Sequence, residues 1–198
     1  MAFFHYEKNV KDIEYYEILE NLMERWEYET VEFKEAKSNY DTDKIGRYFS
    51  ALSNEANLKQ QQYGWLIFGV SERDKIKHVV GTAYKQGEQS LLEKFKYEIS
   101  RDITNGMTFY EIKEIFPIVN GKRLRVLMFK VPAAATGIPT DWRTNYYERS
   151  GESLVPLKQY KIDAIRSQER KDWSKQVIEV ATIDNLDKTA INLAREKY

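Results

Sequence analysis

The stretch from residue 63 to residue 70 constrains the fold more than any other part of the chain. It reads Tyr-Gly-Trp-Leu-Ile-Phe-Gly-Val and is apolar without a polar residue at every second position. A strand covered on one face alternates between apolar and polar side chains, whereas a strand covered on both faces does not. The sequence therefore predicts a central β-strand, with other elements packed on both faces of its sheet.

Helical and strand-like patterns surround this central strand. Asp41-Thr42-Asp43 offers a helix N-cap, and Asn120-Gly121 is a strong signal for a tight hairpin. The order of the elements indicates an α+β fold, with a mixed β-sheet, flanking helices and a helical C-terminal tail. The predicted helices cover residues 13–26, 41–57 and 90–103 and much of the chain from residue 157, and the predicted strands cover residues 30–36, 63–70, 79–80, 109–118, 124–131, 146–147 and 154–155.

The length of the chain sets the domain organisation that we expect. Its 198 residues suit one domain of ordinary size, or one domain with an appendage. We predict a domain over residues 1–160 that includes the N-terminal helix. Residues 161–198 are expected to form a helical tail or a linker into a C-terminal domain that is missing from this chain; a simple C-terminal helix packed on the domain is the alternative.

Composition and motifs exclude several classes of protein. The absence of Cys rules out disulfide frameworks, thiol nucleophiles and cysteine zinc sites. P-loop, GxGxxG and GxSxG motifs are missing, and His5 and His78 lie far apart in the sequence, so ATPase, His-zinc and Ser-His-Asp chemistry are unsupported. No apolar run approaches the roughly 20 residues of a membrane span, and the N-terminus lacks signal-peptide features. We therefore expect a soluble, cytoplasmic protein with no membrane partner.

Charge is balanced overall but unevenly distributed. The formal net charge is zero, which is unusual for a free-standing nucleic-acid binder that depends on salt-sensitive phosphate contacts. Residues 1–37 carry ten acidic and five basic side chains, whereas residues 120–149 carry six basic and two acidic ones. An overall balance can thus hide a basic surface, although solvated faces of differing charge would give the same pattern.

The most basic region also contains interleaved aromatic residues. Arginines bind phosphates and aromatic rings stack on unpaired bases, so this mixture suits a nucleic-acid partner. Alternatively, Trp142 and one Tyr belong to the core, and Arg149 pairs locally with Glu148 or Glu152. The candidate phosphate-binding side chains are Lys122, Arg123, Arg125, Arg143 and Arg149, and the candidate stacking side chains are Trp142 and Tyr146.

A second candidate site lies in the predicted strand at residues 30–36. If Val31 and Phe33 face the core, then Thr30, Glu32, Lys34 and Ala36 share the opposite face. A carboxylate can help to hold a divalent cation while a nearby lysine stabilises charge on a phosphodiester. Glu27 precedes the strand and offers a second carboxylate. The alternative is a solvated edge strand with ordinary cross-strand charge pairs.

Five segments in sequence order resemble one known family. The chain is similar to the Schlafen-type AlbA-like (divergent AlbA) domain, which is found in Schlafen proteins and at the front of many bacterial RecG-related helicase-like proteins and transcriptional regulators. The match extends over roughly residues 15–160. The five segments are residues 27–34, residues 44–54 with their Ser-Ala-x-x-Asn ending, the glycine-bounded strand at 64–72, the hairpin at 109–131 and the Tyr-x-Arg-x-Gly element at 145–153.

The resemblance implies a nucleic-acid-binding, in particular DNA-binding, module of a bacterial transcriptional regulator or helicase-related protein. It also implies an alternative, a metal-dependent endoribonuclease in which Glu27, Glu32 and Glu72 hold Mg²⁺ or Mn²⁺ and Lys34 assists at the phosphate. Two departures from the family weaken this alternative. Residues 55–63 replace the family's Asn-Thr-x-Gly-Gly segment. Glu72 stands where the family's nucleases carry a third carboxylate, but its side chain is one methylene longer than that of an aspartate, which moves the carboxylate oxygens. A third hypothesis is a protein-interaction domain that forms a homodimer.

Overall fold

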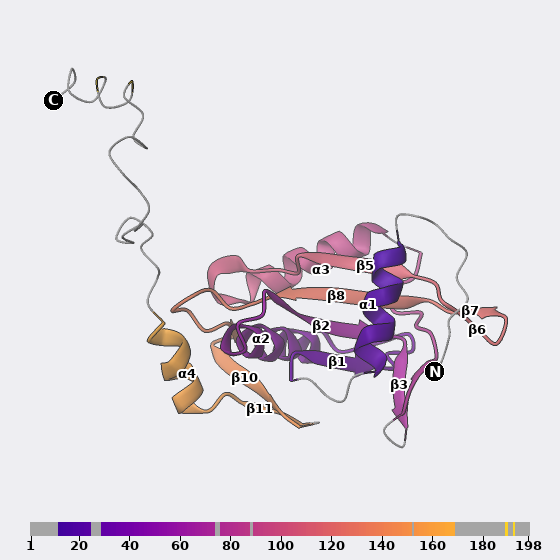
Figure 1. The fold of residues 1–198 in the computed structure, drawn as a ribbon, viewed down its shortest axis with the longest axis horizontal. Helices are drawn as coiled ribbons and strands as arrows, with labels where there is room; N and C mark the ends of the chain where they lie inside the picture. Colours follow the sequence, from indigo (N-terminus) through magenta and orange to yellow (C-terminus); the bar gives the residue numbers. More distant parts are fainter. Residues whose placement is uncertain are drawn as a thin grey trace. The chain divides into compact units, whose positions relative to one another are not determined.

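The computed structural model describes residues 12–24, 29–73, 76–87, 89–151, 153–168, 189 and 192. A four-stranded sheet forms the centre of the fold, in the order β1 (Val31–Lys34), β2 (Tyr63–Phe68), β8 (Val126–Pro132) and β5 (Glu111–Ile115). β1 and β2 are parallel, whereas β8 is antiparallel to both β2 and β5. Figure 1 shows these strands side by side. The sheet is therefore mixed, and the predicted α+β class is confirmed.

The central position of β2 follows from its apolar sequence. Trp65 and Ile67 face one side of the sheet, and Leu66 and Phe68 face the other; all four are buried. The predicted strand is, however, interrupted at Gly69, whose positive φ of 93° turns the chain out of the sheet. A separate hairpin follows, made of β3 (Val70–Arg73) and β4 (Ile76–Val79).

Helices cover both faces of the sheet (Figure 1). α1 (Ile13–Glu24) crosses one face and packs on it through Tyr16 and Leu19. α2 (Thr42–Leu58) and α3 (Gln89–Arg101) lie against the other face. The carboxylate of Asp41 caps α2 by accepting a 2.9 Å hydrogen bond from the Asp43 backbone N–H, as predicted. The helices and the sheet therefore form three layers, with the sheet in the middle.

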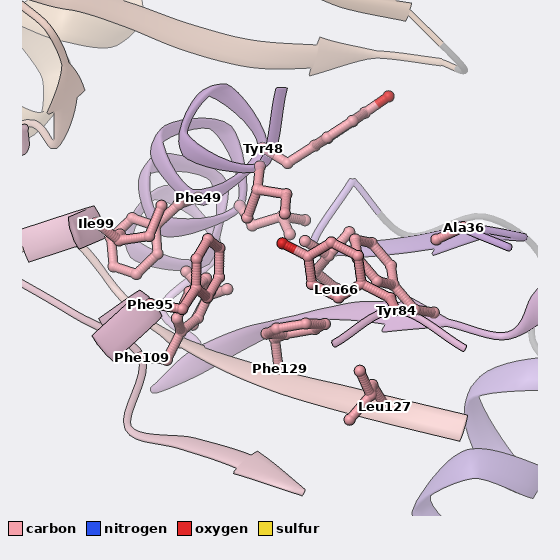
Figure 2. Close-up of a cluster of buried hydrophobic side chains, with 14 of the residues drawn as sticks. Ala36, Tyr48, Phe49, Leu66, Tyr84, Phe95, Ile99, Phe109, Leu127 and Phe129 are labelled. Atoms are coloured by element: carbon pink, nitrogen blue, oxygen red, sulfur yellow. The ribbon is translucent and has the colours of Figure 1, made fainter. Parts of the chain in front are cut away.

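Aromatic rings fill the space between the sheet and the two helices on its second face (Figure 2). Phe109 contacts both the helices and the sheet in this cluster. Its ring centroid lies 5.0 Å from that of Phe49 on α2 and 5.2 Å from that of Phe129 on β8. Phe95 of α3 stacks on Phe109 at 6.0 Å. Phe49, Phe95, Phe109 and Phe129 are all buried, so removing any one of them would open a cavity in the core.

Two β-hairpins project from one end of the sheet. The second hairpin consists of β6 (Ile118–Val119) and β7 (Lys122–Arg123), joined by Asn120 and Gly121, whose φ angles are 50° and 72°. Two positive φ angles are the requirement of a type I′ turn, so the Asn-Gly prediction is confirmed. The β3–β4 hairpin follows β2, and the β6–β7 hairpin connects β5 to β8. Since the end of β2 lies beside the start of β8, both leave the sheet at the same end (Figure 1).

The last part of the domain packs on α2. β9 (Asp141–Trp142), β10 (Asn145–Ser150) and β11 (Ser153–Pro156) form a small antiparallel sheet, and α4 (Gln159–Arg166) follows it. A short 3₁₀ helix at Thr104–Gly106 links α3 to β5. The buried amide of Asn54 on α2 donates to the Thr140 carbonyl and accepts from the Thr140 N–H, both at 2.8 Å. The Ser-Ala-x-x-Asn ending of the α2 motif thus fastens the helix to the segment before β9.

The chain divides into two compact units, Met1–Gln168 and Glu169–Tyr198. Within the second unit only residues 189 and 192 are described, so the predicted tail lies almost wholly outside the described residues. The predicted domain boundary after residue 160 stays a prediction. Among the described residues, no helix combines the length and the apolar character needed to cross a membrane.

The close contact between α2 and Trp142 makes a specific demand on Gly46. A Cβ atom at this position would lie 2.1 Å from the Trp142 indole. We predict that Gly46→Ala destabilises the protein by about 1–3 kcal/mol through overpacking, despite the gain of about 1 kcal/mol in helix propensity. Urea unfolding of Gly46→Ala beside Lys44→Ala, an exposed control on the same helix, measures this difference. Equal stability of the two variants would contradict the packing.

Candidate nucleic-acid interface

The polar face of β1 is internal to the protein. Val31 and Phe33 pack towards α1, and Glu32 and Lys34 point to the opposite side, so the predicted alternation is confirmed. The alternative of a solvated strand face is wrong, because Glu32 is only 4% exposed and Thr30 only 2%. α2 and β10 cover this side of the strand, as the contacts of Tyr48 and Arg149 described below show.

Both carboxylate oxygens of Glu32 are already engaged by cations. Oε1 lies 2.5 Å from the Lys34 ammonium, and Oε2 lies 2.7 Å from Nε of Arg149. The Lys34 ammonium also lies 5.1 Å from the centre of the Tyr48 ring. Burial acts to lower the pKa of Lys34, but the attraction of the Glu32 carboxylate outweighs it, and the pKa is raised overall. Lys34 is therefore held in its charged form beside Glu32.

Arg149 joins β10 to the edge of β1. In addition to Glu32, its guanidinium donates to the Val31 carbonyl and, at 3.2 Å, to the Gly151 carbonyl. Arg149 is 6% exposed, so a phosphate could reach it only if β10 moved away from β1. Of the two local partners considered for Arg149, Glu148 meets Lys161, and Glu152 lies outside the described residues. The partners of the Arg149 guanidinium described here are all internal to the protein.

Of the three predicted metal-binding carboxylates, the structure describes only Glu32 and Glu72. Glu27 lies outside the described residues, and Glu72 is exposed on β3, opposite Lys77 of β4. Among the described residues, no three acidic or histidine side chains are grouped so that they could hold a metal ion. Because Lys34 and Arg149 neutralise Glu32 at close range, the described side chains do not fit Mg²⁺ or Mn²⁺.

A second buried ion cluster fixes α4. The Lys161 ammonium contacts Glu55 of α2 and lies 2.9 Å from Oε2 of Glu148 on β10. Both carboxylates are 1% exposed. Burial raises the pKa of Glu55 above its ordinary value, and the Lys161 ammonium opposes that rise. The pKa of Lys161 is raised, because its two carboxylate partners outweigh its own burial. These charges hold three elements together.

The aromatic and arginine side chains of the β9–β10 turn differ in exposure. Trp142 is 1% exposed, and its Nε1 donates a 2.8 Å hydrogen bond to Asp43, which holds the pKa of that carboxyl below its usual range. Trp142 is thus a core residue, as the alternative interpretation had it. Arg143 is exposed, but it lies 2.8 Å from Asp102 and 3.4 Å from Asp43. Tyr146 is half-buried beside Leu157 and α4.

The β6–β7 hairpin carries the predicted cations that do reach solvent. Lys122 and Arg123 are both exposed. The Arg123 guanidinium lies over the Phe116 ring at 4.6 Å from its centre, a stacking geometry that orients the guanidinium while leaving its N–H groups accessible. Arg125, two residues further on, is 6% exposed; it donates to Glu114 at 2.6 Å and to the Tyr84 carbonyl at 2.8 Å. Arg125 therefore anchors the loop before α3 and does not face a ligand.

Arg123 also lies between two depressions of the surface. One, of about 440 Å³, is bounded by the loop at 81–86 and by Phe116, Arg123, Leu124 and Arg125. The other, of about 230 Å³, is bounded by Tyr16, Phe116, Ile118, Gly121 and Arg123. Phe116 and Arg123 border both, so a ligand contacting the hairpin meets an aromatic ring as well as a positive charge.

Sequence reasoning missed the contribution of the first hairpin. Arg73 on β3 is exposed, and Lys77 on β4 lies with its ammonium 5.3 Å from the centre of the Phe33 ring. Because the two hairpins leave the same end of the sheet, these cations lie at the end that carries Lys122 and Arg123 (Figure 1). We call this the hairpin end: residues 70–73, 76–79 and 118–123. The run Ser71-Glu-Arg-Asp-Lys-Ile-Lys77 was the signal available in the sequence.

Comparisons with known proteins agree with this fold. The Schlafen, AlbA_2 family model matches residues 27–158, which is more than half of the chain. The crystal structure of the DIP2311 protein from Corynebacterium diphtheriae is similar, with a TM-score of 0.52 and 20% sequence identity; the similarity covers 95% of this chain and 34% of that one. This chain thus spans about a third of the length of that neighbour. No curated protein sequence matches it significantly.

The Glu32–Arg149 pair predicts a stability effect that a catalytic role would not produce. Breaking a buried ion pair costs about 3–5 kcal/mol, because one charge stays buried alone. We expect Glu32→Gln and Arg149→Met each to lower the free energy of unfolding by about 3 kcal/mol, and the double variant to cost about 1–3 kcal/mol less than the sum. Urea unfolding of the four proteins measures the coupling. Additive effects would contradict a direct interaction.

The Lys161 cluster predicts a pH dependence of stability. In Lys161→Met the carboxyl of Glu55 loses the ammonium that lowers its pKa, so this pKa rises further above the unfolded value of 4.5. A raised folded-state pKa means that stability is greatest below pH 4.5 and falls as the pH rises through the folded pKa. Each unit of additional elevation costs about 1.4 kcal/mol at neutral pH. Thermal melts between acidic and neutral pH should therefore show a steeper loss in Lys161→Met than in the wild type, and parallel curves would count against the cluster.

Proposed function

Since this chain belongs to the Schlafen AlbA_2 family, which suggests a nucleic-acid-related role, we propose that it binds nucleic acid through its hairpin end. The observation that carries this proposal is the exposed pair Lys122 and Arg123 on a narrow two-stranded ribbon. Among the described residues neither side chain makes an ion pair, whereas Arg125, Arg143 and Arg149 all face carboxylates. Their charge is therefore free to neutralise phosphates.

The shape of this end suits a polynucleotide. A two-stranded β-ribbon fits the major groove of duplex DNA, and its cations can contact phosphates on the groove edge. The Phe116 ring and the depressions beside Arg123 offer an apolar contact for a base. Arg73 and Lys77 on the neighbouring hairpin extend the positive surface, which the zero net charge of the whole chain conceals.

We also propose a role for this chain as one part of a longer protein. The solved neighbour is about three times as long as the segment matched, so a domain of this kind occurs as one part of a larger chain. We propose that the present chain is the DNA- or RNA-binding module of a cytoplasmic bacterial transcriptional regulator or helicase-related protein. In that role the hairpin end supplies phosphate contacts, and a further domain supplies any enzymatic activity.

Removing the two hairpin cations tests the proposal. We expect Lys122→Ala/Arg123→Ala to weaken binding to a fluorescent duplex DNA and to a single-stranded RNA by about tenfold or more, and to reduce the slope of log affinity against log salt by roughly 1–2. Fluorescence anisotropy at several salt concentrations gives both quantities.

The matched control removes the same charge elsewhere. Lys94→Ala/Lys158→Ala takes away two exposed cations, one on α3 and one next to α4. We expect this control to bind with nearly the wild-type salt slope. Equal losses in the two double variants would show a non-specific charge effect, and an absence of binding by the wild type at low salt would refute the proposal.

A further inference from the structure

Among the described residues, no strand pairs with the outer edge of β5. β5 is the last strand in the order β1-β2-β8-β5 and pairs with β8 on its inner side. At the opposite edge of the sheet, Arg149 covers β1 by donating to the Val31 carbonyl. An exposed edge offers a row of backbone donors and acceptors to another strand, and proteins usually cover or block it.

The hydrogen-bond pattern shows which residues of β5 face outwards. The Ala133 N–H donates to the Gln62 carbonyl at 3.0 Å, so the odd-numbered residues of β8 pair with β2 and the even-numbered ones pair with β5. In the register of β5 with β8, Ile112 and Glu114 then point their backbone groups away from β8. Phe116 follows the same alternation, and its outward N–H is met by the Tyr16 hydroxyl at 3.1 Å.

Ile112 and Glu114 differ from Phe116 in this respect. Within the described part of the chain, no hydrogen bond is made to the outward backbone groups of these two residues. Glu111 and Lys113 alternate with Ile112 and Glu114 along the strand. Their side chains lie on the face of the sheet that carries α1. Glu111 accepts a hydrogen bond from Tyr15, and Lys113 lies 2.7 Å from Asp12. These contacts hold one negative and one positive side chain upright along the edge.

Charge selects one pairing between two copies of this edge. If two β5 strands align antiparallel with Ile112 opposite Ile112, Glu111 of each copy lies opposite Lys113 of the other. Shifting the register by one step in either direction places Glu111 opposite Glu111 or Lys113 opposite Lys113. Opposite charges that face each other across antiparallel strands stabilise the pair, and like charges destabilise it. The edge is thus complementary to itself in a single register.

We propose that the chain forms a two-fold symmetric homodimer through β5, in which the two four-stranded sheets join into one continuous sheet. The two Ile112 residues exchange backbone hydrogen bonds across the two-fold axis. The Glu111–Lys113 pairs lie on the α1 face, one on each side of the two-fold axis. A symmetric, self-complementary contact of this kind closes at two copies.

Exposed tyrosines beside the edge support this partner. Among the described residues, Tyr97 and Tyr110 are the two most exposed large hydrophobic side chains, at 71% and 65%. Tyr110 precedes β5 directly. The Thr108 hydroxyl donates to the Lys96 carbonyl at 2.8 Å, so the turn of α3 that carries Tyr97 lies next to the start of β5. A second copy paired at β5 would cover Tyr110 and bring the two α3 helices near each other, which gives these rings a partner.

Charge reversal tests both the dimer and its register. Sedimentation equilibrium of the wild type should show a monomer–dimer equilibrium. Glu111→Lys places Lys opposite Lys113, and Lys113→Glu places Glu opposite Glu111, so each variant alone should dissociate about tenfold more readily or worse. When the two variants are mixed, every facing pair is again opposite in charge, and a heterodimer of near wild-type affinity should form. The control Lys158→Glu should dimerise as the wild type does.

Three results would overturn the proposal: a wild type that stays monomeric across the dilution series, single variants that dimerise normally, or a mixture that does not recover dimers. If either reversal fails to fold by circular dichroism, cysteines replace it, because the chain has no Cys of its own. Mild oxidation of mixed Glu111→Cys and Lys113→Cys chains should then link unlike chains in preference to like chains. Equal or absent linking would refute the register.

Discussion

The ion pair between Glu32 and Arg149 is the contact on which the arrangement of this domain depends. Its two charges lie 2.7 Å apart, both nearly inaccessible to water, and they come from strands separated by more than a hundred residues. Each charge would be costly to bury alone, so removing either one destabilises the packing of β10 beside β1. The position of β10 in turn places Glu148, which meets Lys161 and so fixes α4. The Glu32–Arg149 pair thereby stabilises the position of β10 and, through Glu148, that of α4.

This pair also changes the meaning of the motifs that resemble the Schlafen family. The acidic and basic residues of Glu32-Phe-Lys34 and of the Tyr-x-Arg-x-Gly element interact with each other inside the protein rather than facing a substrate. Arg125 and Trp142 likewise satisfy internal partners. Of the cations predicted to contact phosphates, Lys122 and Arg123 lie exposed on the β6–β7 hairpin and make no ion pair among the described residues. The interior motifs thus specify the fold, and the less distinctive hairpins provide the surface that we assign to nucleic acid.

Much of this fold could be predicted from the sequence, because periodicity reports which residues share a face. The unbroken apolar stretch at 63–70 indicated a central strand, Asn120-Gly121 indicated a hairpin, and the alternation at Val31 and Phe33 indicated their common face. Periodicity does not report what covers a face, so Glu32 was expected in solvent. Arg123 and Arg125 show the same limit: they lie two residues apart with similar local sequence, yet one stacks on Phe116 at the surface and the other is buried against Glu114. Arg125 is buried because Glu114 and the carbonyls of Thr82 and Tyr84 surround its guanidinium, which the local sequence does not report.

The central claim is that the hairpin end binds nucleic acid while the buried charges hold the scaffold. Titrating the isotope-labelled protein with a short duplex DNA and following its backbone amide resonances tests this claim most directly. We predict that the amide resonances of the hairpin end (residues 70–73, 76–79 and 118–123) shift progressively, while those of Glu32, Glu148 and Arg149 do not change. Shifts concentrated on β1 and β10, with the two hairpins unaffected, would contradict it.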